Sequence, residues 1–423
     1  MNIAIYTNDF NWAGGVDLLH GIVKGLLAQK KRPVKIYILI HDPLIKEPLT
    51  FKLIPNIKLL LRSIRTIRYQ LKTAFMQKRN DVATNVDSFD IYSYVMEIFS
   101  EEKVSLLFYN EQLPASREKI LDSIESDVVL PFLFSRVDKN SKVPWLGYIF
   151  DFVYKYHSHL YTPAFCLQTD IYYATILLKA KAVIVNSKEV LKDIEKFFPY
   201  SNTRLFAMPF APYTNSITYQ KALDNNEVKS KYKIPKRYFI ICNQFWLHKS
   251  HETAFDALSH LHKKLRHTDV CLVCTGQMTD ISGTENRKQE LKKYAEDLEL
   301  SKDIFFLGHI SKVDQLALMI RSEGLLQPTT FEGGPGGGAV YMAVANGVPS
   351  IVSDIPVNKE IENEPLVKFF KVKDHIDLAG KMNEQLNIGF ALLSTNQIED
   401  KNSERLALLG DTLIDSINFV MKS

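Results

Sequence analysis

The chain has 423 residues, of which 46% are hydrophobic and 24% charged, and its formal net charge is +4. This is the balance of an ordinary globular protein of about two to three domains, and so small a charge does not by itself imply a nucleic-acid partner. A strand pattern begins directly at Met1 without a basic leader, and no run approaches the ~18 uncharged apolar residues of a membrane-spanning helix. We therefore expect neither secretion nor a transmembrane segment.

Strands and helices alternate from the start of the chain. Residues 3–6 predict a strand, a loop with Gly14 and Gly15 follows, and apolar residues at helical spacing over 16–27 lead to a second strand at 34–40. Glycines after the first strand of a parallel sheet lie where such sheets bind ligands, but a plain turn has the same pattern. The opening is therefore a βαβ unit, and both interpretations of its glycines stay open.

Residues 58–79 form a one-sided basic segment. On a helix, its cationic side chains would share one arc beside an apolar arc. They are Lys58, Arg62, Arg65, Arg68, Lys72 and Arg79. Such an arc can lie on an anionic membrane surface, or it can be the solvated face of a surface helix, and the sequence favours neither.

A further strand ends in Asp151 and is followed by Tyr154, Lys155 and His157 in a predicted loop. Loops after parallel strands carry the chemistry of many α/β proteins, so these side chains are candidates for a site. An aspartate in this place is as often a helix cap as a catalytic group. Both roles stay open for Asp151.

The alternation of strands and helices restarts after residues 211–236, a polar stretch with prolines that we interpret as the link between two domains. In the second series, Cys271 and Cys274 have CxxC spacing inside a predicted strand at 270–275. Residues three apart in a strand point to opposite faces, so we expect two buried thiols and no redox or zinc pair. Four cysteines in a chain of this length are also typical of a reducing compartment.

The most informative stretch is 327–338. A short strand at 324–326 leads into a loop with Glu332 and five glycines, and a helix is predicted over 339–345. A helix N-terminus has unpaired backbone N–H groups and the positive end of the helix dipole, so this junction suits a phosphate. A tight connection without a ligand is the alternative, but a carboxylate beside an anion site needs a role of its own.

These residues resemble the donor-site signature of GT-B glycosyltransferases of the glycosyltransferase family 4 type, carried by residues 331–337, 345–349 and 353–360. The glycine loop at 14–16, the segment 143–157 and the loop 243–249 with its lysine resemble other conserved parts of that family. The resemblance implies an α/β GT-B fold, with two Rossmann-like domains whose parallel sheets face a central cleft. The expected domains are 1–212, joined by a C-terminal helix at 405–423, and 213–404.

The resemblance also implies an activity, the retaining transfer of a sugar from a nucleoside-diphosphate sugar to a glycan or lipid-linked acceptor. We expect a place in bacterial surface polysaccharide synthesis, of O-antigen or capsule, in the cytoplasm or at the inner face of its membrane. No metal and no cofactor are expected, because Lys249 and the loop amides would neutralise the diphosphate. The expected catalytic residues are Glu332 facing the sugar, Asp151 holding a hydroxyl, and Lys249.

The same resemblance implies which residues bind the two substrates. The expected donor-binding residues are Gly14, Gly15, Gln244, Lys249, Thr275, Gly276, Glu332, Gly333, Gly334, Pro335, Gly336, Gly337 and Gly338. The expected acceptor side is formed by Tyr154, Lys155 and His157.

Two positions depart from the family pattern. The second acidic residue of the family corresponds to Val340, or to Met342 if the loop is two residues longer, and neither is acidic. Gln244 stands where the family has an arginine. These changes favour a second hypothesis, a binding subunit without turnover that supports a partner enzyme. A dinucleotide oxidoreductase is disfavoured, because no glycine fingerprint is followed by an acidic residue ~20 positions later.

Overall fold

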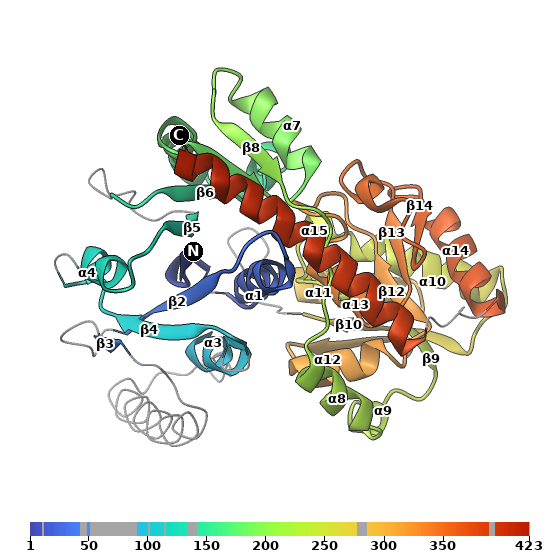
Figure 1. Ribbon diagram of the computed structural model, residues 1–423. Helices are drawn as coiled ribbons and strands as arrows, with labels where there is room; N and C mark the ends of the chain where they lie inside the picture. Colours follow the sequence, from blue (N-terminus) through green and yellow to red (C-terminus); the bar gives the residue numbers. More distant parts are fainter. Residues whose placement is uncertain are drawn as a thin grey trace, which may run out of the picture.

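The structure, a computed structural model, describes residues 1–10, 12–42, 49–50, 91–99, 102–113, 116–132, 142–276, 286–388 and 394–422. The basic segment 58–79 and both of its interpretations lie outside these residues. The described chain forms two α/β domains, each built on its own sheet of mostly parallel strands (Figure 1). Among the described helices, none is both long and apolar enough to cross a membrane.

The first sheet has the strand order β3-β4-β2-β1-β5-β6-β7-β8 in the described part of the chain. Its strands are β1 (Asn2–Tyr6), β2 (Lys35–His41), β3 (Leu49–Thr50), β4 (Ser105–Tyr109), β5 (Val128–Phe132), β6 (Trp145–Ile149), β7 (Ala182–Val185) and β8 (Arg204–Ala207). All neighbours are parallel except β3, which runs antiparallel to β4. Its helices include α1 (Ala13–Ala28), α3 (Ile91–Phe99), α4 (Ser116–Ser123), α5 (Val153–Tyr156), α6 (Pro163–Lys179) and α7 (Lys188–Phe197).

The second sheet has the order β11-β10-β9-β12-β13-β14, and all its neighbours are parallel. The strands are β9 (Arg237–Cys242), β10 (Val270–Thr275), β11 (Ile304–Gly308), β12 (Gly324–Gln327), β13 (Ser350–Ser353) and β14 (Val367–Phe370). The helices that connect them are α10 (His251–Lys263), α11 (Arg287–Asp297), α12 (Lys312–Met319), α13 (Gly337–Ala345) and α14 (His375–Ile388). In this doubly covered sheet β10 is buried along its whole length, as expected for a central parallel strand.

The two cysteines of the CxxC pair lie on opposite faces of β10. Cys271 packs in the core cluster that contains Val340, and Cys274 packs in the cluster that contains Phe255 on the other face. Burial raises the pKa of the Cys271 thiol to about 12, so it stays protonated and inert. The prediction of two core thiols is confirmed.

The stretch between the sheets, which we interpreted as the link between two domains, contains two short helices. It contains α8 (Ser216–Asp224), which Asn215 caps by accepting from the Thr218 amide at 3.0 Å, and α9 (Val228–Lys231). Ala222 and Val228 are fully buried in the core of the second domain. Such short helices bury only one or two apolar side chains each, which is too few for a periodic pattern in the sequence.

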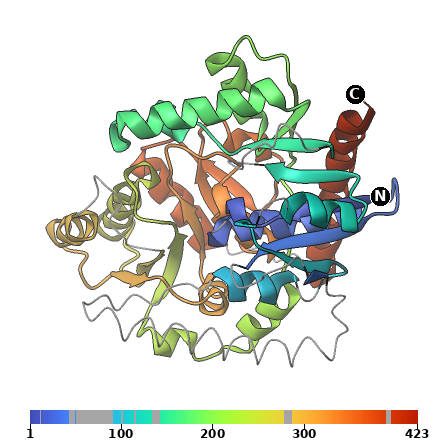
Figure 2. The same cartoon turned by 90° about the vertical axis from the view of Figure 1, so that its left-hand side faces the viewer.

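The last helix, α15 (Thr395–Lys422), returns from the second domain to the first (Figure 1). Its C-terminal half packs beside α1 on one face of the first sheet, as the red helix in Figure 2 also shows. Near its start, the amide of Asn402 donates to the carbonyl of Ala345 at 2.9 Å. The hydroxyl of Thr214, in the link between the sheets, donates to the same carbonyl at 2.7 Å. Both crossings of the chain therefore meet at the end of α13.

Gly410 is the point of closest approach between α15 and α1. A Cβ atom there would lie 2.0 Å from the carbonyl oxygen of Gly25, which is backbone and has no rotamer to move into. We therefore expect Gly410→Ala to separate the two helices and to lower the free energy of unfolding by about 2 kcal/mol, measured in urea. Leu408→Ala is the control, because Leu408 is on the same helix and is 57% exposed. Equal stability of the two variants would contradict this packing.

Candidate functional site

The glycine-rich loop passes from β12 into α13, and the helix begins at Gly337, two residues earlier than predicted. Gly336 and Gly337 have φ values of 68° and 63°, in the left-handed region that glycine adopts without cost. The Gly336 amide donates to the Asn358 side chain at 2.7 Å, and the Gly337 amide to the Gly334 carbonyl at 3.1 Å. The next amides, of Gly338 and Ala339, lie in the first helical turn, where N–H groups have no intrahelical acceptor. Open space surrounds the Cβ position of Gly338, so a ligand can approach them.

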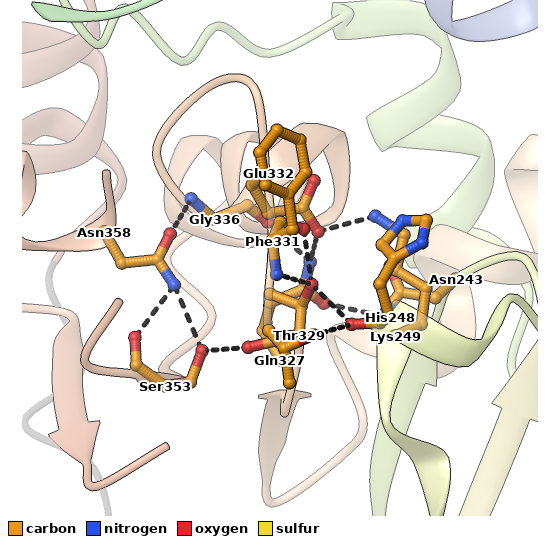
Figure 3. A network of polar contacts seen from close by, with 11 residues as sticks. Asn243, His248, Lys249, Gln327, Thr329, Phe331, Glu332, Gly336, Ser353 and Asn358 are labelled. Carbon is orange, nitrogen blue, oxygen red and sulfur yellow. Dashed lines mark hydrogen bonds and ion pairs between the residues drawn. The ribbon is translucent and has the colours of Figure 1, made fainter. Parts of the chain in front are cut away.

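Beneath this loop, a polar network joins three segments of the second domain (Figure 3). Lys249 Nζ lies 2.6 Å from Glu332 Oε1. Gln327, at the end of β12, donates its amide to the same Glu332 oxygen at 2.9 Å and to the Gly336 carbonyl at 2.8 Å. The Asn243 amide donates to Gln327 Oε1 at 2.7 Å. Gln327 thereby fixes the carboxylate, the glycine-rich loop and the loop after β9 in one geometry.

The Lys249–Glu332 ion pair was not predicted from the sequence. We expected Lys249 to face a phosphate and Glu332 to face a sugar, as separate groups. In the structure they neutralise each other, with 14% and 9% of their side chains exposed. A lysine this close to a helix N-terminus adds to the positive potential there, and the glutamate balances it while no anion is bound.

Gln327→Leu tests the role of this glutamine. The change would leave Asn243, Glu332 and the Gly336 carbonyl each without one hydrogen bond. We expect the free energy of unfolding to fall by roughly 2 kcal/mol, because buried polar groups that lose their partner are costly. The measurement is urea unfolding, with the exposed Gln220→Leu as control. A variant as stable as the wild type would show that the network is not the support of this loop.

Asp151 reaches the glycine-rich loop from the opposite domain. Asp151 follows β6. A Cβ atom at Gly333 would lie 2.7 Å from the Asp151 Cβ, so these two segments of the chain are in contact. Its Oδ1 accepts from the Val153 amide at 2.9 Å at the start of α5. Asp151 therefore binds the first amide of α5 and also lies against the glycine-rich loop, although the N-cap position itself is that of Phe152. Burial raises the pKa of Asp151 to about 6, the Val153 amide opposes this rise, and the negative charge of Glu332 adds to it.

The raised pKa of Asp151 predicts how the stability of the protein depends on pH. The folded protein binds the Asp151 proton more tightly than the unfolded chain, whose carboxyl has the ordinary pKa of 3.8. The stabilising contribution of Asp151 is thus complete below pH 3.8 and is lost as the pH rises through about 6. Asp151→Asn should therefore gain stability over the wild type as the pH rises from 4 to 8, by up to about 3 kcal/mol. Thermal unfolding at both pH values measures this, with the exposed Asp224→Asn as control. A stability advantage of Asp151→Asn over the wild type that decreases from pH 4 to pH 8 would contradict this prediction.

Further contacts join α7 of the first domain to the second domain. The Ser187 hydroxyl donates to the Gly333 carbonyl at 2.9 Å. The Glu360 carboxylate accepts from the Lys188 and Glu189 amides at 3.1 and 2.8 Å, so it caps α7 from the other domain. Ser187 was not among the predicted site residues, because a serine directly before a helix is the ordinary pattern of an N-cap, and Ser187 is also the N-cap of α7.

Two sets of predicted site residues lie in helices rather than in the predicted loops. Gly14 and Gly15 belong to the first turn of α1, so the loop prediction was wrong. Tyr154 and Lys155 are in α5, and both bind Asp170 of α6, with the Tyr154 hydroxyl and Lys155 Nζ each 2.6 Å from its carboxylate. Their predicted loop is wrong as well, and their side chains are engaged by α6.

The remaining predicted residues lie at several places in the two domains. The ring of His157 is 6.0 Å from that of Phe331, across the domain boundary. The buried Thr275 hydroxyl accepts from Gln315 at 2.9 Å, and Gly276 is pressed against the Asn243 carbonyl. Gln244 is exposed, Gly334 is half-buried and Pro335 is buried. Their roles toward a donor stay predictions.

Both candidate positions for the second acidic residue of the family are apolar contacts of the core. Val340 is fully buried and Met342 is half-buried, and both pack in the cluster beneath α13. Neither position offers a polar group. Where most family members have a carboxylate, this chain has an apolar side chain that packs in the core.

Comparisons with known proteins agree with this architecture. Residues 224–401 match the family model described as Glycosyl transferases group 1. The structure of HepE from Anabaena in complex with UDP and glucose has a TM-score of 0.60 at 13% identity, and the match covers 99% of each chain. A UDP-forming trehalose-phosphate synthase from Burkholderia xenovorans has a TM-score of 0.60 at 12% identity, over 99% of this chain and 98% of that one.

Sucrose-phosphate synthase from Thermosynechococcus elongatus has a TM-score of 0.59 at 12% identity, over 99% of this chain and 97% of that one. No curated protein matches the sequence. At these identities the structural likeness establishes the fold, and the family model bears on the second domain. The chain therefore has the GT-B fold, and its residues 224–401 are similar to the Glycosyl transferases group 1 family.

Proposed function

We propose that the protein is a glycosyltransferase that moves a sugar from a nucleoside-diphosphate sugar to a hydroxyl acceptor. The observation that carries this proposal is a paired lysine and glutamate beneath a glycine-rich helix N-terminus, with an aspartate of the other domain against the same loop. The family match over 224–401 supports the same reaction class. The likeness to HepE, whose structure holds UDP and glucose, makes UDP-glucose the first donor to test.

The arrangement suits the separation of charge in such a transfer. The diphosphate leaving group would accept hydrogen bonds from the Gly338 and Ala339 amides and attract Lys249 away from Glu332. These groups would stabilise the negative charge that develops as the glycosidic bond breaks. Glu332 would then be free to hold hydroxyls of the sugar beside its developing positive charge. Asp151, ionised above pH about 6, would hold the acceptor hydroxyl.

We further propose that transfer retains the anomeric configuration and that the acceptor belongs to a bacterial surface polysaccharide, as a glycan or a lipid-linked glycan. Both proposals rest on the family resemblance of the motif at 331–360. The configuration is measured by following the anomeric proton of the product by NMR during turnover. A product of inverted configuration would reject the retaining mechanism while leaving the transferase itself intact.

A second candidate is a binding subunit that holds a nucleotide sugar without transferring it. The apolar Val340 and Met342, where most of the family has a carboxylate, favour it. Thermal shift with nucleoside diphosphates and their sugars, followed by transfer assays, separates the two candidates, because a ligand of the folded form raises its melting temperature. Turnover that is lost in Glu332→Gln identifies the enzyme. Stabilisation by ligand without turnover identifies the subunit, and no stabilisation by any nucleotide rejects both.

A further inference from the structure

An exposed indole lies at the entrance of α1. Trp12 is the residue before the helix and is 38% exposed, although aromatic rings surround it. The ring of Phe10 stacks on it at 5.8 Å with an interplanar angle of 23°. The ring of Phe150 meets it edge-on at 6.0 Å. Two aromatic neighbours thus fix the position of the indole while leaving part of it open to solvent.

The pair of glycines in α1 makes room for this indole. A Cβ atom at Gly15 would lie 2.9 Å from two ring atoms of Trp12, Cδ2 and Cε2, and 2.9 Å from the Phe10 carbonyl oxygen. A Cβ atom at Gly14 would lie 3.4 Å from the indole nitrogen. Any side chain at position 15 would therefore displace the ring. This gives Gly15 a specific reason to be glycine that involves no phosphate.

Phe150 lies between the Trp12 indole and the glycine-rich loop. Phe150, its edge-on neighbour, precedes Asp151, and the Phe150 carbonyl oxygen is 3.0 Å from the Cβ position of Gly333. Trp12 therefore belongs to the wall that the first domain presents to the proposed site. Lys249 and the start of α13 lie in the second domain, whereas Trp12 lies in the first.

We propose that Trp12 is a platform on which a pyranose ring of the acceptor stacks, which makes the acceptor a saccharide at its reacting end. The proposal rests on the proposed function and names the substrate class of that site. The face of an aromatic ring is negative, and the C–H groups on one face of a pyranose carry partial positive charge, so the two faces attract. A ring held in advance by Phe10, Phe150 and Gly15 loses little entropy when the sugar binds.

Saturation-transfer difference NMR tests the platform without turnover. The probes are the methyl α- and β-glycosides of glucose, galactose, mannose and N-acetylglucosamine. In the wild type we expect saturation to be strongest on the C–H protons of one pyranose face, the signature of stacking. Trp12→Ala should weaken binding of the same probe roughly threefold to tenfold, the size of one aromatic stacking contact. Trp12→Phe, which keeps a smaller ring, should lie between the two.

Gly15→Ala gives an independent arm, because it displaces the indole without removing it and should weaken saccharide binding as Trp12→Ala does. Tyr172→Ala is the matched control, since Tyr172 is 36% exposed on α6 and should not affect binding. In Trp12→Ala, Trp12→Phe and Tyr172→Ala, the binding of UDP, measured by thermal shift, should be unchanged. If no nucleoside diphosphate binds the wild type, the proposed function fails while the saccharide result stands. Equal saccharide binding by the wild type and Trp12→Ala, or binding of no probe by the wild type, overturns the platform.

Discussion

Replacing Lys249 by methionine should abolish sugar transfer and weaken the fold at the same time. The lysine is the cation placed at the start of α13, and we expect its loss to lower kcat/KM by about 100-fold to 1000-fold, as for other groups that stabilise a leaving charge. Its loss also leaves the Glu332 carboxylate buried, with the Gln327 amide as its remaining side-chain partner among the described residues. Breaking a buried ion pair from one side typically costs about 3 kcal/mol. Steady-state kinetics with the donor identified by thermal shift, and urea unfolding, measure the two effects.

The double variant Lys249→Met with Glu332→Gln separates these effects. It removes the unpaired charge, so it should recover most of the lost stability while remaining inactive. Lys31→Met is the matched control, because Lys31 also lies 2.9 Å from a carboxylate, that of Asp415, but the two side chains are 42% and 57% exposed. Exposed pairs contribute at most about 1 kcal/mol, so this variant should stay close to the wild type in both measurements. Transfer by Lys249→Met at the wild-type rate would reject the assigned role of the lysine.

Gly333→Ala should hold the two domains apart. Its Cβ would lie 2.7 Å from the Asp151 Cβ and 3.0 Å from the Phe150 carbonyl oxygen, both in the other domain. Backbone atoms and a Cβ cannot rotate away, so the clash is relieved only if the domains separate. We expect kcat/KM to fall about 100-fold, the usual cost of a displacement of ~1 Å between reacting groups. The stability of each domain should change little, because neither core contains this contact.

The measurements for Gly333→Ala are steady-state kinetics and the radius of gyration from solution X-ray scattering, which should increase. Gly334→Ala is the control from the same loop, because its Cβ would lie 3.6 Å from the Asn186 Cβ, an ordinary van der Waals distance. It should retain a compact shape. A Gly333→Ala protein with unchanged shape and rate would mean that the domains do not meet at this loop during transfer.

The fold could be predicted from the sequence because parallel strands buried on both faces give continuous apolar runs that alternate with helical periodicity. The elements that escaped prediction have physical reasons. β5 contains Pro131, and a proline inside an apolar run argues against a strand. α13 begins with two glycines, which are poor helix formers, so its start was placed two residues late.

The candidate site was predicted less completely than the fold. The glycine-rich loop and Glu332 were evident from local spacing, because a strand, a turn and a helix are consecutive in sequence. The ion pair of Glu332 was not, because Lys249 is 83 positions away and its direction depends on how β9 and β12 pair. Gln327 gave no signal, because a single amide at the end of a buried strand has no motif. Its role appears only when its three partners are placed around it.

The carbonyl of Ala345 accepts from Thr214 of the link and from Asn402 of α15, so both tethers between the domains are fastened at the end of α13. The link between the sheets and α15 thus bind the same residue of the second domain. The first turn of α13 lies at the other end of the same helix, roughly 12 Å away at 1.5 Å per residue. The two segments that connect the domains therefore bind one end of the helix whose other end is the proposed phosphate position.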